Sequence, residues 1–173
     1  GIHWYSDREV SLPASGQDDK IPKVIHQIWI GGQPSDEIAK WMNEVKTAHE
    51  AIGWEYRLWG NVEITELDCV RHFEKCSSSS IASDLIRYEI LQRFGGVYLD
   101  ADFELIRPLD DSFLQDDVWI CHEQDLSLAE IRVNGYCSCG AIGSKSNSKT
   151  LTACVEKMGD ANFDDEAHLC LGP

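Results

Sequence analysis

The segment from residue 81 to residue 105 constrains the fold of this 173-residue chain more than any other. Its first part, up to Phe94, places apolar side chains at helical spacing, at Ile81, Leu85, Tyr88 and Leu91. Gly95-Gly96 follows, and glycine there favours a helix end because it adopts positive φ without strain. In residues 97–105 every second residue is apolar, which is the period of a strand. A long helix that passes directly into a strand predicts an α/β domain.

The rest of the chain continues this alternation. We expect further strands at residues 24–30, 54–58, 118–121 and 131–142, and further helices at residues 36–49, 63–75 and 150–158. Ser35 offers an N-cap for the 36–49 helix, and Asp36 and Glu37 place negative charge in its first turn. A length of 173 residues is typical of one domain. The sequence therefore predicts a single α/β domain over residues 21–173, preceded by an extended arm over residues 1–20.

Charge and hydropathy exclude two classes of partner. Asp and Glu outnumber Lys and Arg 30 to 15, and the resulting net charge of −15 repels nucleic-acid phosphates and anionic lipid surfaces. No apolar run approaches the ~18 residues of a membrane span, and residues 1–20 lack the apolar centre of a signal peptide. We expect neither a nucleic-acid partner nor a membrane span in this chain. An anchor upstream of Gly1 is left open.

The seven cysteines are odd in number, so at least one has no partner within the chain. Reduced thiols are the simpler interpretation, and they predict a cytoplasmic protein. Cys137 and Cys139 are separated by one residue, whereas zinc sites use about two to four, and no second Cys or His pair lies nearby. We therefore expect thiols packed as small apolar groups rather than a zinc site.

Asp100 and Asp102 form the first candidate site. In a strand they point to the same side, with Cα atoms roughly 6.5–7 Å apart. Like charges this close repel unless a cation or water separates them, and a hard cation such as Mg²⁺ or Mn²⁺ is the natural ligand. Two carboxylates leave most of the cation's coordination shell open for a substrate's phosphates. Ligands of open α/β sheets also bind at the carboxyl ends of strands. The pattern predicts a metal site here, although Asp-x-Asp also occurs by chance.

The helix before this strand supplies a second candidate group. Asp84 and Arg87 are three residues apart and so are neighbours on one helix face, with Ser83 beside them. The alternative is an ordinary surface ion pair, which contributes about 0–1 kcal/mol. His26 lies inside the apolar 24–30 strand, where a buried structural histidine is favoured over a catalytic base.

Two long motifs resemble one glycosyltransferase family. Residues 81–102, which run from Ile-Ala-Ser-Asp to Leu-Asp-Ala-Asp, resemble the sugar-binding region containing the Asp-x-Asp motif. The family includes the yeast initiating α-1,6-mannosyltransferase, bacterial capsular-polysaccharide transferases and, more distantly, the large clostridial glucosylating toxins. Residues 21–31 (IPKVIHQIWIG) and 56–59 (YRLW) resemble its first and second strands, and Asn134-Gly135 and Leu171-Gly172-Pro173 resemble its Asn-Gly strand and Thr-Gly-Pro turn.

The resemblance implies a GT-A fold, a Rossmann-like α/β sandwich with a mixed, mostly parallel sheet. It also implies retaining transfer of a hexose from a nucleotide-sugar donor to a glycan or other hydroxyl acceptor, as in polysaccharide biosynthesis. The implied catalytic residues, which hold the donor sugar and its phosphates, are Asp84, Arg87 and Asp100. The implied substrate-binding residues are Trp29 near the nucleotide base, Ser83, Tyr98 and Asn134. Asp102, with Asp100, is implied to ligate Mn²⁺ or Mg²⁺, and no general base is implied.

The chain departs from the family pattern at its C-terminal end. Members continue past the Gly-Pro turn into a segment with His and Trp residues that closes over the diphosphate, whereas this chain stops at Pro173 and has Leu171 in place of the family's Thr. We therefore expect a domain that lacks its C-terminal segment and binds donor weakly on its own.

Two alternatives stay open from the sequence. A non-catalytic module that binds a sugar or nucleotide-sugar would carry the same motifs. A haloacid-dehalogenase-type phosphatase also ends a strand in Asp-x-Asp, but Glu104 stands where that class has Thr or Val. The donor base, the sugar, the acceptor and the oligomeric state are not specified by these residues.

Overall fold

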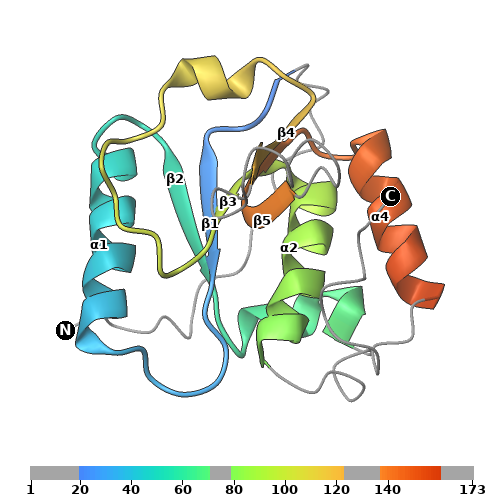
Figure 1. The fold of residues 1–173 in the computed structure, drawn as a ribbon, viewed down its shortest axis with the longest axis horizontal. Helices are drawn as coiled ribbons and strands as arrows, with labels where there is room; N and C mark the ends of the chain where they lie inside the picture. The colour runs from blue at the N-terminus through green and yellow to red at the C-terminus, as the bar shows by residue number, and fades with distance from the viewer. Residues whose placement is uncertain (1–19, 71–78, 123–136, 161–173) are drawn as a thin grey trace, which may run out of the picture.

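A computed structural model describes residues 20–70, 79–122 and 137–160 of the chain. The expectations for the arm at 1–19, for Asn134 and for the turn at 171–173 fall outside these residues. In the described part, one mixed sheet lies between helices (Figure 1). The predicted α/β fold class is confirmed.

Five strands form the sheet in the order β2-β1-β3-β5-β4. They are β1 (Val24–Ile28), β2 (Glu55–Trp59), β3 (Gly96–Leu99), β4 (Val118–His122) and β5 (Cys137–Ser144). β1 pairs in parallel with both β2 and β3, whereas β5 pairs antiparallel with β3 and β4. The carboxyl ends of β1, β2 and β3 therefore meet at one edge of the sheet, the lower edge in Figure 1.

Helices cover both faces of the sheet. The helix α1 (Asp36–Glu50) lies on one face, and α2 (Ser79–Phe94) and α4 (Lys149–Asp160) lie side by side on the other (Figure 1). The Ser35 hydroxyl caps α1 as predicted, by accepting a hydrogen bond from the Ile38 amide at 3.2 Å. None of the described helices is long and apolar enough to cross a lipid bilayer.

Two short 3-10 helices accompany these elements, η1 (Glu63–Glu66) and η3 (Asp111–Leu114). The short helix expected at residues 63–75 is present in its described part as 3-10 turns, in η1 and at residues 68–70, rather than as a continuous helix. The β-branched residues Val62, Ile64 and Thr65 disfavour an α-helix, and the Leu67 amide closes a tighter turn onto the Ile64 carbonyl. The other expected elements are present, with β1 ending at Ile28 rather than at residue 30. The strand expected at residues 131–142 is described from Cys137 and ends at Ser144.

Each face of the sheet has its own apolar core. The core on the α1 side contains Ile25, Val45, Trp54, Val97 and Leu99. The core under α2 and α4 contains Ile86, Leu91, Tyr98, Ile142 and Leu151. β3 contributes to both cores, and Val97, Tyr98 and Leu99 are 0%, 2% and 8% exposed. The polar face expected for this strand is therefore absent along Gly96–Leu99, because a central strand between two helix layers is covered on both sides.

β3 is also shorter than the predicted 97–105 strand. It ends at Leu99, and residues 101–102 form a turn. The Asp100 carbonyl accepts hydrogen bonds from the Gln27 side chain (Nε2 to O, 3.1 Å) and from the Phe103 amide (3.3 Å), so the chain leaves the sheet at this point. The prediction that Asp100 and Asp102 share one face of a strand is wrong.

Two glycines connect α2 to β3 without a loop. Gly95 and Gly96 have φ values of 65° and 105°, which favour glycine. A Cβ on Gly95 would stand 2.6 Å from the Ser146 amide nitrogen, and one on Gly96 would stand 2.8 Å from the Val24 carbonyl oxygen. Backbone conformation and packing both require glycine at this junction.

Candidate functional site

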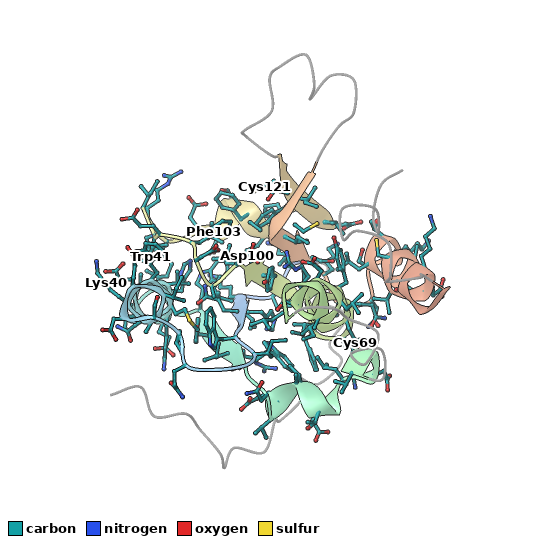
Figure 2. The ribbon with its side chains drawn as sticks, turned by 60° about the horizontal axis from the view of Figure 1, so that its bottom comes forward. Lys40, Trp41, Cys69, Asp100, Phe103 and Cys121 are labelled. Carbon is teal, nitrogen blue, oxygen red and sulfur yellow. The ribbon has the colours of Figure 1, made fainter. Side chains whose placement is uncertain are left out.

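The predicted sugar-site residues Asp84, Arg87, Tyr98 and Asp100 lie together at the carboxyl edge of the parallel strands. α2 supplies the first two, and β3 and the residue after it supply the others. Arg87 Nη2 lies 2.6 Å from Asp84 Oδ1 and 3.4 Å from Asp100 Oδ1. The Tyr98 hydroxyl donates to the same Asp100 Oδ1 at 2.6 Å. Two carboxylates thus share one guanidinium, and Figure 2 turns this edge forward with Asp100 near the centre of the view.

The guanidinium of Arg87 is buried. Its side chain is 7% exposed, against 39% for Asp84 and 32% for Asp100. Nη1 donates to the Cys139 carbonyl on β5 at 2.5 Å, and the guanidinium lies 4.6 Å from the centroid of the Tyr98 ring. Burial lowers the pKa of Arg87, but the neighbouring Tyr98, Asp100 and Asp84 groups outweigh burial and raise that pKa above its ordinary value. Arg87 is therefore a fixed, enclosed positive charge, unlike the surface ion pair that was the alternative.

Tyr98 is the neutral member of this cluster. Burial raises the pKa of its phenol well above the ordinary value; the charge of Arg87 opposes this rise and that of Asp100 adds to it. The hydroxyl therefore keeps its proton and donates it in the short hydrogen bond to Asp100. This bond and the Arg87 contact both engage Oδ1, while Oδ2 lies against the backbone of Gly140.

Asp102 lies in the turn after β3 and is exposed. It stays close in sequence to Asp100 at the same sheet edge, although the two residues do not share a strand face. Among the described residues, no group of three or more His, Cys, Asp or Glu side chains is arranged to hold a metal ion. Both side chains are carboxylates, whose oxygen atoms are the ligands that Mg²⁺ and Mn²⁺ prefer in proteins.

The other predicted substrate-binding residues take different positions. Trp29 follows the end of β1, the strand next to β3, and its indole N–H donates to the Gly32 carbonyl at 2.7 Å. Ser83 precedes Asp84 on α2, and its carbonyl accepts a long hydrogen bond, 3.4 Å, from Arg87 Nε. Trp29 thus follows a strand end at the same sheet edge as the cluster. Ser83 contacts the cluster through its backbone, and Asn134 lies outside the described residues.

His26 is the buried structural histidine that the sequence predicts. It is 0% exposed, its Nε2 donates to the Gly95 carbonyl at 2.8 Å, and its Nδ1 accepts from the Trp59 indole N–H at 3.0 Å. Burial lowers the pKa of His26 to about 3, with the Gly95 bond opposing this shift and Arg57 adding to it. The neutral ring therefore ties β1 and β2 to the glycine junction that orients α2.

Gln27, Cys139 and Gly140 also belong to this neighbourhood, although the sequence motifs do not point to their roles. Gln27 is fully buried in the structure. The sequence does contain a signal for it, because a polar residue stands there within an otherwise apolar strand. A Cβ on Gly140 would stand 2.8 Å from Asp100 Oδ2, so this glycine makes room for the carboxylate. The roles of Cys139 and Gly140 depend on the pairing of β5 with β3, which no local pattern reveals.

Sequence comparisons identify relatives of this chain. The family model described as "Glycosyltransferase sugar-binding region containing DXD motif" matches residues 23–124. Inositol phosphoceramide mannosyltransferase 1 of Schizosaccharomyces pombe is 30% identical over an alignment 112 residues long, which covers 61% of this chain and 35% of the yeast protein. Subversion of eukaryotic traffic protein A of Legionella pneumophila is 26% identical over an alignment 138 residues long, which covers 64% of this chain and 21% of that protein. The chain spans about a third of the length of the first of these relatives.

A solved structure agrees with the fold. The PaToxG glycosyltransferase superposes with a TM-score of 0.60 at 16% sequence identity, covering 89% of this chain and 66% of that one. This likeness supports the predicted GT-A architecture. Since the family model covers more than half of the chain, including every described residue of the Arg87 cluster except the β5 carbonyl, the chain belongs to the glycosyltransferase family whose sugar-binding region contains the DXD motif.

Proposed function

We propose that this domain binds a nucleotide-sugar donor and transfers its hexose, with retention of configuration, to a glycan or other hydroxyl acceptor in a reaction that requires Mn²⁺ or Mg²⁺. The observation that carries the proposal is the buried Arg87 shared by Asp84 and Asp100 at the edge where open α/β sheets bind ligands. One relative is named a mannosyltransferase of inositol phosphoceramide, so mannose is the first donor sugar to test.

Each group has a defined task in this proposal. The enclosed charge of Arg87 stabilises the negative charge that develops on the departing nucleoside diphosphate, and the low-dielectric setting strengthens this effect. Asp84 and Asp100 accept hydrogen bonds from the sugar hydroxyls and orient the ring. Trp29 contacts the base, and Ser83, Tyr98 and Asn134 complete the donor contacts. A divalent cation bound with Asp102 and Asp100 would neutralise further charge on the leaving group.

The proposal includes no side-chain general base, because in a retaining transfer the leaving phosphate can accept the acceptor's proton. The described histidine side chains support this choice. His26 and His49 are both 0% exposed. Both ring nitrogens of His49 are engaged, Nδ1 with the Val45 carbonyl at 2.7 Å and Nε2 with the Leu109 amide at 3.0 Å. Neither imidazole can reach a bound acceptor.

Release of nucleoside diphosphate from a panel of UDP- and GDP-sugars tests the proposal. We expect release with Mn²⁺ or Mg²⁺ and none with a chelator, and proton NMR of the product gives its anomeric configuration. Asp84→Asn should abolish most release, whereas Lys40→Met, which removes an exposed pair with Glu44, should retain it. Inversion of configuration, or release that the chelator does not affect, would contradict the corresponding part of the proposal.

The non-catalytic module is the second candidate, because the chain covers only part of its relatives. Donor binding by calorimetry without release from any donor would favour it. Family membership leaves the phosphatase alternative without support. The cytoplasmic location is also a proposal. It rests on the free thiols of Cys69, Cys121, Cys139 and Cys154, and cell fractionation tests it.

A further inference from the structure

Gln27 is a buried polar residue that the proposed chemistry does not use. It lies in β1 and is 0% exposed. A buried amide is costly unless its donor and acceptor groups are paired. Gln27 pairs both. Its Oε1 accepts from the Tyr56 hydroxyl at 2.9 Å, and its Nε2 donates to the Asp100 carbonyl at 3.1 Å.

Tyr56 fixes the orientation of this amide. Burial, with a further contribution from Glu50, raises the pKa of the Tyr56 phenol, so the hydroxyl keeps its proton. It therefore donates to Gln27, and the amide oxygen must face β2. The amide nitrogen then faces β3 and has the Asp100 carbonyl as its acceptor. A side-chain bridge thus runs from β2 across β1 to the end of β3.

The bridge ends just beyond the point where β3 stops pairing with β1. The backbone ladder between β1 and β3 covers Ile25 with Val97 and His26 with Tyr98. At Asp100 the amide still bonds to the Gly140 carbonyl of β5 at 2.8 Å, while on the β1 side the Gln27 side chain takes the carbonyl. The Asp100 backbone is therefore held from both sides, and the turn to Asp102 starts from this fixed point.

We propose that Gln27 is a positioning residue of the donor site. Through the Asp100 carbonyl it sets the direction of the 100–103 turn, and with it the separation of the Asp100 and Asp102 carboxylates. This inference rests on the proposed function, in which these carboxylates hold a cation together with the donor's phosphates. Groups that orient metal ligands without touching the metal commonly change metal affinity by about 10–100-fold.

Three variants of the full chain separate positioning from stability. Gln27→Met keeps the size of the side chain and removes both hydrogen bonds. Tyr56→Phe leaves the amide in place but removes the bond that orients it. Val45→Ala is the matched control: Val45 is 1% exposed and packs in the core that Tyr56 also contacts, so its truncation destabilises the same side of the sheet but removes neither hydrogen bond of the Gln27 amide.

Two measurements test the inference: calorimetric titration of Mn²⁺ in the presence of UDP or GDP, and hydrogen exchange of the 100–107 segment. We expect Gln27→Met to raise the Mn²⁺ concentration for half-maximal nucleotide binding at least tenfold and to accelerate exchange in this segment. Tyr56→Phe should do the same to a smaller extent, and it carries the test if Gln27→Met fails to fold. Val45→Ala should change neither, and nucleotide binding without metal should be equal in all variants.

The results distinguish this inference from the function beneath it. Wild-type metal dependence and exchange in Gln27→Met would overturn the role of Gln27 and leave the proposed function standing. A wild-type chain without metal-dependent nucleotide binding would overturn both the proposed cation site and the functional consequence of Gln27. A loss of metal affinity in Val45→Ala equal to that in Gln27→Met would show a general effect of stability and overturn positioning.

Discussion

Replacing Arg87 by Met should destabilise the fold by about 3–5 kcal/mol, the range for breaking a buried ion pair from one side. A surface pair would lose about 0–1 kcal/mol. The larger value follows from burial, because the Arg87 side chain is 7% exposed and its guanidinium contacts two carboxylates and a backbone carbonyl.

This loss of stability can be divided among the groups that lose their contact with Arg87. The Cys139 carbonyl loses its charged donor, and an unsatisfied acceptor costs about 1–3 kcal/mol. Asp84 and Asp100, both partly buried, lose the cation between them and repel each other, which accounts for the remainder. Met fills most of the volume of the arginine stem, so a cavity contributes little.

Urea unfolding followed by circular dichroism and tryptophan fluorescence measures this loss. With a urea dependence of about 2 kcal/mol per molar, the midpoint should fall by about 2 M. Lys40→Met is the control, since Lys40 is 68% exposed and lies 3.6 Å from Glu44, a helix pair that contributes less than about 0.5 kcal/mol. Equal, small losses in both variants would refute the argument, because they would show that water solvates the Arg87 guanidinium.

Asp102→Ala should retain the stability of the parent, because an exposed turn residue packs little, and should lose Mn²⁺-dependent donor binding in calorimetry; unchanged metal dependence would remove Asp102 from the site. Gly140→Ala places a Cβ 2.8 Å from Asp100 Oδ2 and should weaken donor binding about tenfold, roughly 1.4 kcal/mol. In the control Gly32→Ala the added Cβ has no atom within 4 Å, so this variant should bind donor as the parent does. Equal affinities would contradict the contact. Stability should fall as pH drops below about 6.5, because His26 has its pKa lowered to about 3 by burial and takes up a proton only on unfolding. Its contribution approaches about 1.4 kcal/mol per pH unit midway between these values, and a flat series of urea midpoints from about pH 7.5 to about 4.5 would show that the fold tolerates a charged His26.

The parts of the site that the sequence predicts are those set by local spacing. The i,i+3 relation places Asp84 beside Arg87 whatever the rest of the chain does, and the Gly95-Gly96 pair marks the end of α2. The burial of Arg87 is not set by local spacing. Arg87 is enclosed by β5, whose Cys139 carbonyl is distant in sequence and becomes a neighbour only when β5 pairs with β3. No pattern within α2 contains that information.

The length of β3 illustrates the same limit. Alternation of apolar residues continues to Leu105, so periodicity alone extends the strand through both carboxylates. The strand stops at Leu99, and the carbonyl of the next residue bonds to the Gln27 side chain of another strand and to the Phe103 amide of the turn. The local period does not contain these contacts, and the two carboxylates lie on a turn instead of a strand face.

The glycine junction between α2 and β3 fixes the spacing between Arg87 and Asp100. α2 brings Arg87 and β3 leads to Asp100, and Gly95-Gly96 fixes where one stands relative to the other. One inserted residue would turn the helix by about 100° against the strand and carry the guanidinium away from its carboxylate. Under the proposed function, donors of different size would have to be accommodated by loops at this sheet edge, such as the one after β1, since this junction cannot lengthen and still keep the ion pair.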